Sequence, residues 1–359
     1  MSFGKRSVIT GCGSYLPAVI KPNSDFLEQD FYGEDHQPIK NGKQVIIDKF
    51  QAITGIQERR YADETLKTSD MAAIAARLAI EDSGVDPETL DLVIVAHNFG
   101  DVAGAGQQSD MVPALASRVK SVLGIVNPGC IAFDILFGCP GWIMAVIQAE
   151  AFFKSGMAKK ALIIGAETLS RVYDPFDRDS MIFSDGAGAV ILELKENAAG
   201  GILSCQSASH CKEEVGYLYM GASNNPAYDE DAKLLKMKGR KVYEYALKHV
   251  PLAMKACIDQ AGVSIGDVKK VFIHQANEKM DEAILDAFYK LYDLKAPAAV
   301  MPMCIQYLGN SSVATIPTLL DLVKKGNYEQ HELKTGDIVL FASVGAGMNI
   351  NAVCYQWID

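Results

Sequence analysis

Short apolar runs typical of buried strands alternate with longer helix-like segments along the whole chain. The apolar runs lie at 92–96, 161–165, 189–192, 271–273 and 338–341, and the helix-like segments at 69–82, 142–154, 242–261 and 279–291. A first strand is expected at 7–10, and Ser69 with Asp70 is expected to cap the first long helix. Because strand-like and helix-like segments take turns, the pattern predicts an α/β protein.

A faint internal repeat relates two distant parts of the chain. In one part, a helix-like segment ends at Gly84 and a short link leads to a buried strand followed by His97. In the other, a similar segment ends at Gly262 and leads in the same way to His274. Since any two strand–helix units look alike, this pair of segments by itself leaves both a duplicated fold and a chance likeness open.

The chain is acidic, and its charge excludes several classes of partner. Its 359 residues carry 34 Lys and Arg against 44 Asp and Glu, a net charge of −10. General nucleic-acid binding and attachment to anionic membranes both need clustered basic residues, so neither is expected. A signal-peptide pattern is missing, and no run reaches the roughly 18 apolar residues of a membrane span. We therefore expect a cytoplasmic protein, with two domains or one large α/β unit.

Eight cysteines are spread along the chain, and one of them has the surroundings of a nucleophile. None forms a Cys-x-x-Cys pair, and the spacing of Cys205, His210 and Cys211 fits no zinc pattern, so no metal is expected. Cys139 follows an apolar run, and Pro140 after it suits a first helical position. Cys139 would then lie at the helix N-cap, where the helix dipole favours a thiolate. A buried, inert cysteine is the alternative.

Two polar residues and one glycine-rich loop lie where α/β proteins often place sites. His274 ends the buried strand 271–273, and the carboxyl ends of parallel strands commonly form sites. Asn310 lies in a turn before an apolar helix and by itself predicts a helix cap. The loop 345–347 has backbone amides that could face an oxyanion. The Gly-Cys-Gly at 11–13 lacks a third glycine and a following helix, which argues against NAD binding.

Together these motifs resemble the ketoacyl–acyl-carrier-protein synthase III family of the thiolase superfamily. Cys139 in Gly-Cys-Pro-Gly, His274 in His-Gln-Ala-Asn and Asn310 in Gly-Asn-Ser-Ser-Val-Ala follow one another in the order of that family. Similar family segments match 13–17, 54–56, 184–189 and 345–347, so the resemblance covers essentially the whole chain. It implies a thiolase-like α/β fold in which two duplicated halves, 1–195 and 196–359, form a five-layered αβαβα core.

The resemblance also implies the chemistry. Cys139 would take an acyl group from a carrier, and His274 with Asn310 would stabilise the enolate formed when malonyl–acyl-carrier protein loses CO2. The backbone amides of Cys139 and Ala346 would form the oxyanion hole. The product would be a 3-oxoacyl–acyl-carrier protein, made without a cofactor by a homodimer whose partners are acyl-CoA and acyl-carrier protein.

Several positions bear on the substrates, and some depart from the family. Arg178 resembles an arginine that contacts the CoA nucleotide, and Asn277 matches a position near the pantetheine arm. Lys49 and Ile53 stand where well-known members carry an Arg and a Trp that grip the nucleotide, so a carrier-protein donor becomes an alternative to CoA. Val112 replaces a Phe that closes the acyl tunnel across the dimer, which favours longer or branched primers.

Two questions stay open at this level. The polar segment 25–48 is longer than the family usually has, and we expect either a lid or a dimer contact there. The alternatives to a fatty-acid condensing enzyme are a related acyltransferase or a specialised-metabolite condensing enzyme. A more distant one is a partner subunit without catalysis, although the chain keeps Cys139, His274 and Asn310.

Overall fold

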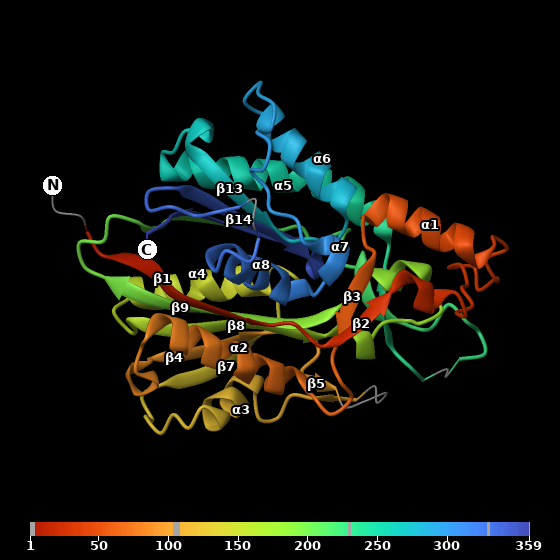
Figure 1. Cartoon of the computed structure of the whole chain (residues 1–359), viewed down its shortest axis with the longest axis horizontal. Helices are drawn as coiled ribbons and strands as arrows, with labels where there is room; N and C mark the ends of the chain where they lie inside the picture. Colours follow the sequence, from red (N-terminus) through yellow and green to blue (C-terminus); the bar gives the residue numbers. More distant parts are fainter. Residues whose placement is uncertain (1–3, 103–107, 229–230, 329–330, 359) are drawn as a thin grey trace.

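Two large β-sheets lie one above the other in the computed structural model, with helices between them (Figure 1). The structure describes residues 4–102, 108–228, 231–328 and 331–358. Helices also cover the outer face of each sheet, so five layers follow in the order helices, sheet, helices, sheet, helices. The αβαβα core expected from the sequence is therefore present.

The first sheet is built from strands of the N-terminal part of the chain. Its strand order is β1 (Arg6–Tyr15), β9 (Asp185–Lys195), β8 (Lys160–Thr168), β4 (Leu92–Ala96) and β7 (Ile131–Ile135). Strand β4 pairs in parallel with β7 and β8, whereas β9 pairs antiparallel with β1 and β8. Helices α2 (Thr68–Ser83) and α3 (Leu115–Val122) pack on its outer face. Strand β7 is left at the edge of the sheet.

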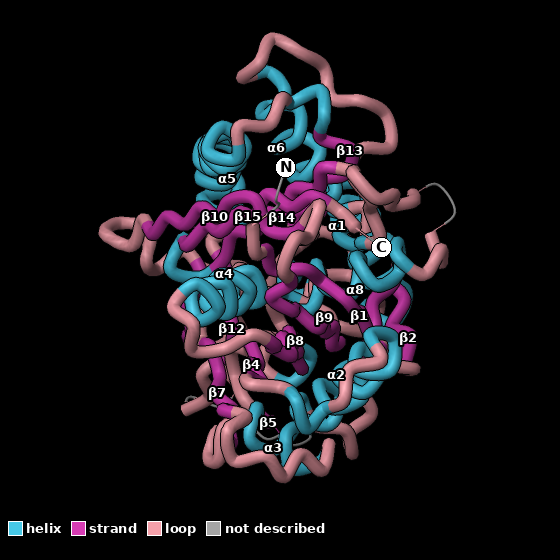
Figure 2. Tube along the Cα trace, turned by 90° about the vertical axis from the view of Figure 1, so that its left-hand side faces the viewer, coloured by secondary structure: helices cyan, strands magenta, loops and turns pink. Residues whose placement is uncertain are grey.

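The second sheet uses strands from the C-terminal part. Its order is β10 (Gly201–Ser209), β15 (Asn349–Gln356), β14 (Ile338–Gly345) and β13 (Val268–Ile273), and only β13 and β14 pair in parallel. Helices α5 (Gly239–Ala261) and α6 (Glu278–Lys290) cover its outer face. Between the sheets lie α4 (Gly141–Lys154) and α8 (Thr315–Lys324), and Figure 2 shows α5 above the second sheet with α4 beneath it.

The middle layer is held by apolar packing from both sheets. Trp142 of α4 packs edge to face on Phe341 of β14, with ring centroids 6.0 Å apart, and both side chains are buried. Because this layer is in contact with both sheets, the site at its end is built from both halves of the chain. Shorter elements surround that end: β2 (Val19–Pro22), β3 (Glu58–Tyr61), β5 (Asp101–Val102), β6 (Ser109–Asp110), β11 (Leu218–Gly221), β12 (Leu234–Met237), α1 (Lys43–Thr54) and α7 (Ile305–Leu308).

The internal repeat is a genuine structural repeat. Helices α2 and α5 both end at a left-handed glycine, Gly84 with φ 67° and Gly262 with φ 68°. A 3-10 turn follows each of them, at Pro87–Thr89 and Ile265–Asp267, and then the parallel strand β4 or β13 begins. The two segments lie far apart in the sequence, yet each contains a helix, a glycine cap, a 3-10 turn and a strand in the same order. The boundary between residues 195 and 196 remains our own division of the chain.

The start of α2 corrects one expectation. The helix begins at Thr68 with Lys67 as its N-cap residue, so Ser69 does not cap it. Instead, the Ser69 hydroxyl donates to the Asp101 carboxylate at 2.7 Å, and Asp70 accepts from the Lys67 amide at 2.9 Å. Ser69 is drawn away from capping because a buried carboxylate needs its hydrogen bonds.

The segment 25–48 is packed against its own chain and is partly helical. Helix α1 begins inside it, and Phe26, Phe31 and Ile46 are buried in a small core with residues 169–183. The Tyr32 amide donates to the Phe176 carbonyl at 2.9 Å. The segment therefore packs as a wall beside the site. Among the described residues, no helix is long and apolar enough to cross a membrane.

Candidate active site

Cys139 lies just before the central helix α4. The N-cap residue is Pro140 and the helix begins at Gly141, so Cys139, which was predicted at the N-cap, stands one residue before the observed cap. Gly138, with φ 67°, makes the turn into this segment, and a Cβ built there would lie 2.7 Å from the Ala346 amide nitrogen. Glycine is therefore required both by the left-handed backbone and by the close approach of a second chain segment.

That second segment is the loop after β14, which the sequence analysis placed in the oxyanion hole. A Cβ built on Gly345 would lie 2.5 Å from the Cys139 amide nitrogen, so the two backbones touch at this point. The Asn349 side-chain amide donates to the Ala346 carbonyl at 2.9 Å and fixes the loop. The amides of Cys139 and Ala346 are consequently neighbours in one rigid corner.

His274 and Asn310 approach Cys139 from two other segments. His274 follows β13, and its amide donates to the Ala342 carbonyl of β14 at 2.9 Å. Asn310 is held beside β9 by its own amide, which donates to the Ile182 carbonyl at 2.9 Å. Both side chains are almost fully buried, 4% and 3% exposed, and both line the same cavity as Cys139. The three residues expected to act together therefore do meet.

Asn310 is not the helix cap that its local sequence predicts, because the N-cap residue of the following 3-10 turn is Ser311 and that of α8 is Ala314. Its side-chain oxygen accepts a hydrogen bond from the Ser312 amide at 2.8 Å, at the start of the 3-10 turn Ser312–Ala314. With its oxygen held this way, the amide nitrogen of Asn310 is the part that can face a substrate carbonyl.

Burial sets the protonation of the site. It raises the pKa of the Cys139 thiol to about 11, although a hydrogen bond with the Ser312 side chain lowers it. It lowers the pKa of His274 to about 4, against a hydrogen bond with the Ser312 main chain that raises it. The imidazole is therefore neutral near pH 7. The thiolate expected from the helix dipole is opposed here by the loss of solvent around the sulfur.

Two adjacent cavities lie on the approach to Cys139. The inner cavity, of about 240 Å³, contains Cys139, His274, Asn310 and Ala346 within mostly apolar walls. The outer cavity, of about 370 Å³, lies beyond it, and the two share Met237, Val242, Ala276 and Met280. A long flexible arm entering from the surface would thus meet an apolar channel before it reaches the sulfur.

The predicted carrier-binding residues surround the outer cavity. Arg178 and Asn277 line it, as do Lys49 and Ile53 of α1, the two positions that depart from the family pattern. Arg178 is about half exposed and pairs with Asp179 at 3.5 Å. Asn277 has a second task, because its side-chain oxygen caps α6 by accepting from the Met280 amide at 3.0 Å.

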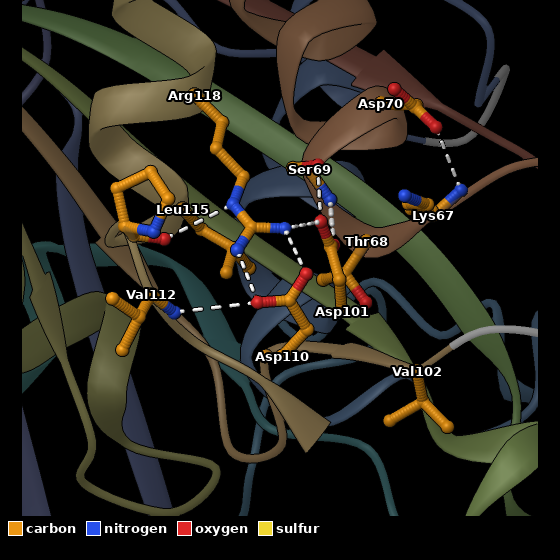
Figure 3. A network of polar contacts seen from close by, with 12 residues as sticks. Lys67, Thr68, Ser69, Asp70, Asp101, Val102, Asp110, Val112, Leu115 and Arg118 are labelled. Atoms are coloured by element: carbon orange, nitrogen blue, oxygen red, sulfur yellow. Dashed lines mark hydrogen bonds and ion pairs between the residues drawn. The ribbon is translucent and has the colours of Figure 1, made fainter. Parts of the chain in front are cut away.

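Val112 lies outside both cavities of its own chain. It is 88% exposed, on the loop that leads into α3. Arg118 fixes this loop by donating to the Pro113 carbonyl at 3.0 Å and to Asp110 at 2.6 Å, and it also reaches Asp101 at 2.8 Å (Figure 3). The Val112 side chain thus points to solvent from a loop that the ion pairs of Arg118 hold in place.

Three polar residues near Cys139 were not found from the sequence. Asn98 donates from its side-chain nitrogen to Glu167 and, at 3.1 Å, to the Ser312 hydroxyl oxygen. Glu167 is 1% exposed and lies near the end of β8, whereas Asn98 follows β4. The rule that singled out His274, a polar group at the carboxyl end of a buried strand, points equally to both. Ser312 lies within the motif that identified Asn310.

The chain is similar to known proteins over nearly its full length. The family model for 3-oxoacyl-(acyl-carrier-protein) synthase III matches residues 133–210, and the model for the C-terminal part of that family matches residues 258–357. A beta-ketoacyl-(acyl-carrier-protein) synthase III of Erythrobacter litoralis is 33% identical, covering 97% of this chain and 98% of that protein. One of Cereibacter sphaeroides is 32% identical, with 98% and 99% covered.

Solved structures agree with this comparison. The 3-oxoacyl-(acyl-carrier-protein) synthase III of Aquifex aeolicus superposes with a TM-score of 0.78 at 30% identity, covering 98% of this chain and 100% of that one. The priming beta-ketosynthase of a polyketide biosynthetic pathway superposes with a TM-score of 0.80 at 26% identity, covering 100% and 98%. The thiolase-like fold expected from the sequence is therefore confirmed.

Proposed function

The chain belongs to the 3-oxoacyl-(acyl-carrier-protein) synthase III family, and we propose that it condenses an acyl primer with malonyl–acyl-carrier protein through a thioester on Cys139. It is an acyltransferase of the condensing type that serves fatty-acid biosynthesis. The observation that carries the proposed mechanism is the convergence of Cys139, His274, Asn310 and Ala346 on one buried cavity. An intact-mass acylation screen across CoA and carrier-protein donors tests it.

Each group in the cavity has a chemical task. The Cys139 sulfur attacks the primer thioester and the carrier sulfur leaves, while the amides of Cys139 and Ala346 hold the oxyanion. Malonyl–acyl-carrier protein then loses CO2, and the electron pair of the broken bond forms an enolate. His274 and Asn310 donate hydrogen bonds to the enolate oxygen. The enolate carbon attacks the acyl group on Cys139, and the sulfur leaves as a thiolate.

A basic rim supports an acyl-carrier protein as partner. Lys49, Arg178 and Arg240 line the outer cavity of a chain whose net charge is −10. The local positive charge would steer an acidic carrier toward the channel despite the overall repulsion. Ile53 has no aromatic ring that could stack on the CoA nucleotide, so CoA is not favoured over the carrier protein. The primer is therefore carried either by CoA or by the carrier protein.

Reversing the charge of Arg240 should weaken carrier binding. This side chain is 90% exposed at the rim, so Arg240→Glu is expected to raise the KM for malonyl–acyl-carrier protein about fivefold to tenfold with little change in kcat. The effect should shrink at high salt because exposed charges are screened. Arg77→Glu, an exposed arginine on α2 at the outer face of the first sheet, is the matched control. Equal KM values for both variants would contradict carrier docking at this rim.

The homodimer is supported by the free edge of the first sheet. Among the described strands, none pairs with the outer side of β7, and Ile131 at its start and Leu136 just after its end are more than half exposed. Apolar side chains on an unpaired edge strand favour pairing with a second copy. Val112, at the loop before α3, would then face the second protomer. We place this dimer in the cytoplasm.

Primer length should depend on Val112. With valine there, the enzyme is expected to use primers of hexanoyl length or longer as well as acetyl, in a series from acetyl to decanoyl. Val112→Phe should shorten the acyl tunnel, because a phenyl ring is larger than the isopropyl group of valine. The kcat/KM for decanoyl, divided by the kcat/KM for acetyl, should therefore fall about tenfold. Val126→Phe, at another highly exposed valine, is the control, and light scattering checks that each variant is dimeric. Strict acetyl preference in the wild type would contradict the prediction.

A second candidate function is condensation in a specialised pathway. The likeness to the priming beta-ketosynthase of a polyketide pathway favours it, as do the departures at Ile53 and Val112. The same acylation screen separates the two functions. Acylation by acetyl donors indicates fatty-acid initiation, whereas a preference for longer or unusual acyl donors indicates the specialised role.

A further inference from the structure

The turn that carries the oxyanion hole has an unfavourable backbone. It consists of Ala346, Gly347 and Met348 and connects β14 to β15. Gly347 has φ 74° and Met348 has φ 46°, so two consecutive residues are left-handed. A methionine keeps this conformation only where its surroundings impose it. The turn therefore depends on contacts from other segments that hold it in this shape.

The Met348 carbonyl oxygen makes those contacts. It accepts one hydrogen bond from the Tyr245 hydroxyl at 2.9 Å and another from the His210 amide at 3.2 Å. Tyr245 projects from α5, and His210 directly follows β10. Because Met348 and Tyr245 are both buried, water competes little for the hydroxyl bond. A carbonyl two residues from Ala346 thus ties the turn to a covering helix and to the end of a strand.

The His210 side chain orients the Tyr245 hydroxyl. A carbonyl oxygen can only accept, so the single hydrogen of this hydroxyl is directed to Met348. In the contact between the Tyr245 oxygen and His210 Nδ1, the imidazole N–H is therefore the donor. The His249 ring stacks on the tyrosine ring, with the centroids 4.5 Å apart. The ring and the hydroxyl are consequently both held in the direction of the turn.

We propose that Tyr245, oriented by His210, is a positioning residue of the oxyanion hole, which rests on the proposed role of Cys139 as nucleophile. Its hydroxyl holds the Met348 carbonyl, so that the turn keeps the Ala346 N–H beside the Cys139 N–H. These two amides receive the negative oxygen that forms when a thioester carbonyl is attacked. Tyr245 lies behind the turn, outside the described lining of both cavities, and acts through the backbone alone.

This role determines which reactions depend on Tyr245. A tetrahedral oxyanion forms at the amides of Cys139 and Ala346 when the primer is transferred, and again when the enolate attacks the acyl group. Decarboxylation places its negative charge at His274 and Asn310 instead. Alkylation of the sulfur by iodoacetamide displaces iodide and forms no oxyanion. Tyr245 should therefore matter for both acyl transfers and for neither of the other two reactions.

Tyr245→Phe removes the hydroxyl, keeps the ring and tests the proposal. Acylation of Cys139 at saturating donor, followed by intact mass, should be about tenfold slower, with the apparent KM for the donor within about twofold. This loss is smaller than the hundredfold or more that removal of an oxyanion donor costs, because the His210 amide still holds the turn. Tyr289→Phe is the matched control. Tyr289 is a buried tyrosine of α6, and its hydroxyl has no hydrogen-bond partner among the described residues.

His210→Phe tests the connection to the histidine. It removes the nitrogen that donates to the tyrosine oxygen, and it keeps both an aromatic ring and the main-chain amide. Acylation should slow about threefold, because the tyrosine hydroxyl is less well directed. In the Tyr245→Phe background the same change should have no further effect, since it acts through the missing hydroxyl. Effects that multiply would contradict the proposed path from His210 through Tyr245.

Two further rates distinguish positioning from general support of the fold. Iodoacetamide alkylation of Cys139, and CO2 release from malonyl–acyl-carrier protein by the alkylated enzyme, should each stay within about twofold in Tyr245→Phe. A parallel loss in either rate would overturn the proposal, because Tyr245 would then merely support the site, and so would an unchanged rate of acylation. A wild type that alkylates but forms no acyl adduct with any donor would instead contradict the proposed function itself.

Discussion

Cys139→Ala is expected to form no acyl adduct and to lose condensation activity by about a thousandfold or more. Without the sulfur, the primer has no covalent attachment point, and the amides of residue 139 and Ala346 have no tetrahedral intermediate to stabilise. The measurement is intact mass after exposure to acyl-CoA or acyl–acyl-carrier protein, followed by product formation with malonyl–acyl-carrier protein. The wild type should gain one acyl mass, and the variant none.

The chain supplies a control within its own cysteines. Cys211 is exposed, whereas Cys139 is partly buried at the inner cavity. Cys211→Ala should keep the full adduct, because exposure alone does not make a thiol a nucleophile toward a thioester. An adduct that survives in Cys139→Ala and disappears in Cys211→Ala would reverse the assignment. Burial raises the pKa of Cys139 to about 11, so adduct formation should accelerate as the pH rises.

The strands and long helices could be predicted because buried positions require apolar residues, and these residues recur in a regular pattern along the local sequence. The run 92–96 is apolar throughout since both faces of β4 are covered, and it matches the observed strand at both ends. Helices α4 and α6 begin within one residue of their predicted starts. Helix caps are harder to predict from the local sequence. Ser69 has the residue type of an N-cap, but its hydroxyl donates to Asp101, which lies in another segment.

The site was predictable where a motif lies within one segment, as for Cys139, His274 and Asn310. The hydrogen bonds from Asn98 to Glu167 and to Ser312 join three segments that only the packed sheets bring together. No spacing in the sequence encodes them. The thiolate predicted at the start of α4 follows from the helix alone, whereas the raised thiol pKa follows from neighbours on other elements that exclude water. Electrostatics at a buried site is a property of the whole fold.

His274→Ala should separate the two halves of the reaction. Removing one hydrogen-bond donor from a developing oxyanion typically costs about a hundredfold to a thousandfold, so CO2 release from malonyl–acyl-carrier protein should fall by that amount. Acylation of Cys139 should stay within a few-fold, since His274 is not its base in this mechanism. Asn310→Ala should behave in the same way. His97→Gln, at the equivalent strand end of the first half, should leave CO2 release per folded molecule unchanged.

The pH profile of His274 gives a second test. Burial lowers the pKa of His274 to about 4, so the imidazole is already neutral well below its ordinary titration range. Lowering the pH from about 8 to about 6 therefore leaves its charge unchanged, and CO2 release should show no inflection near the ordinary histidine pKa of about 6.5. The rate of CO2 release by alkylated enzyme measures this without the Cys139 titration. An inflection near 6.5 that vanishes in His274→Ala would mean that His274 exchanges its proton with solvent, and the neutral donor in this mechanism would be wrong.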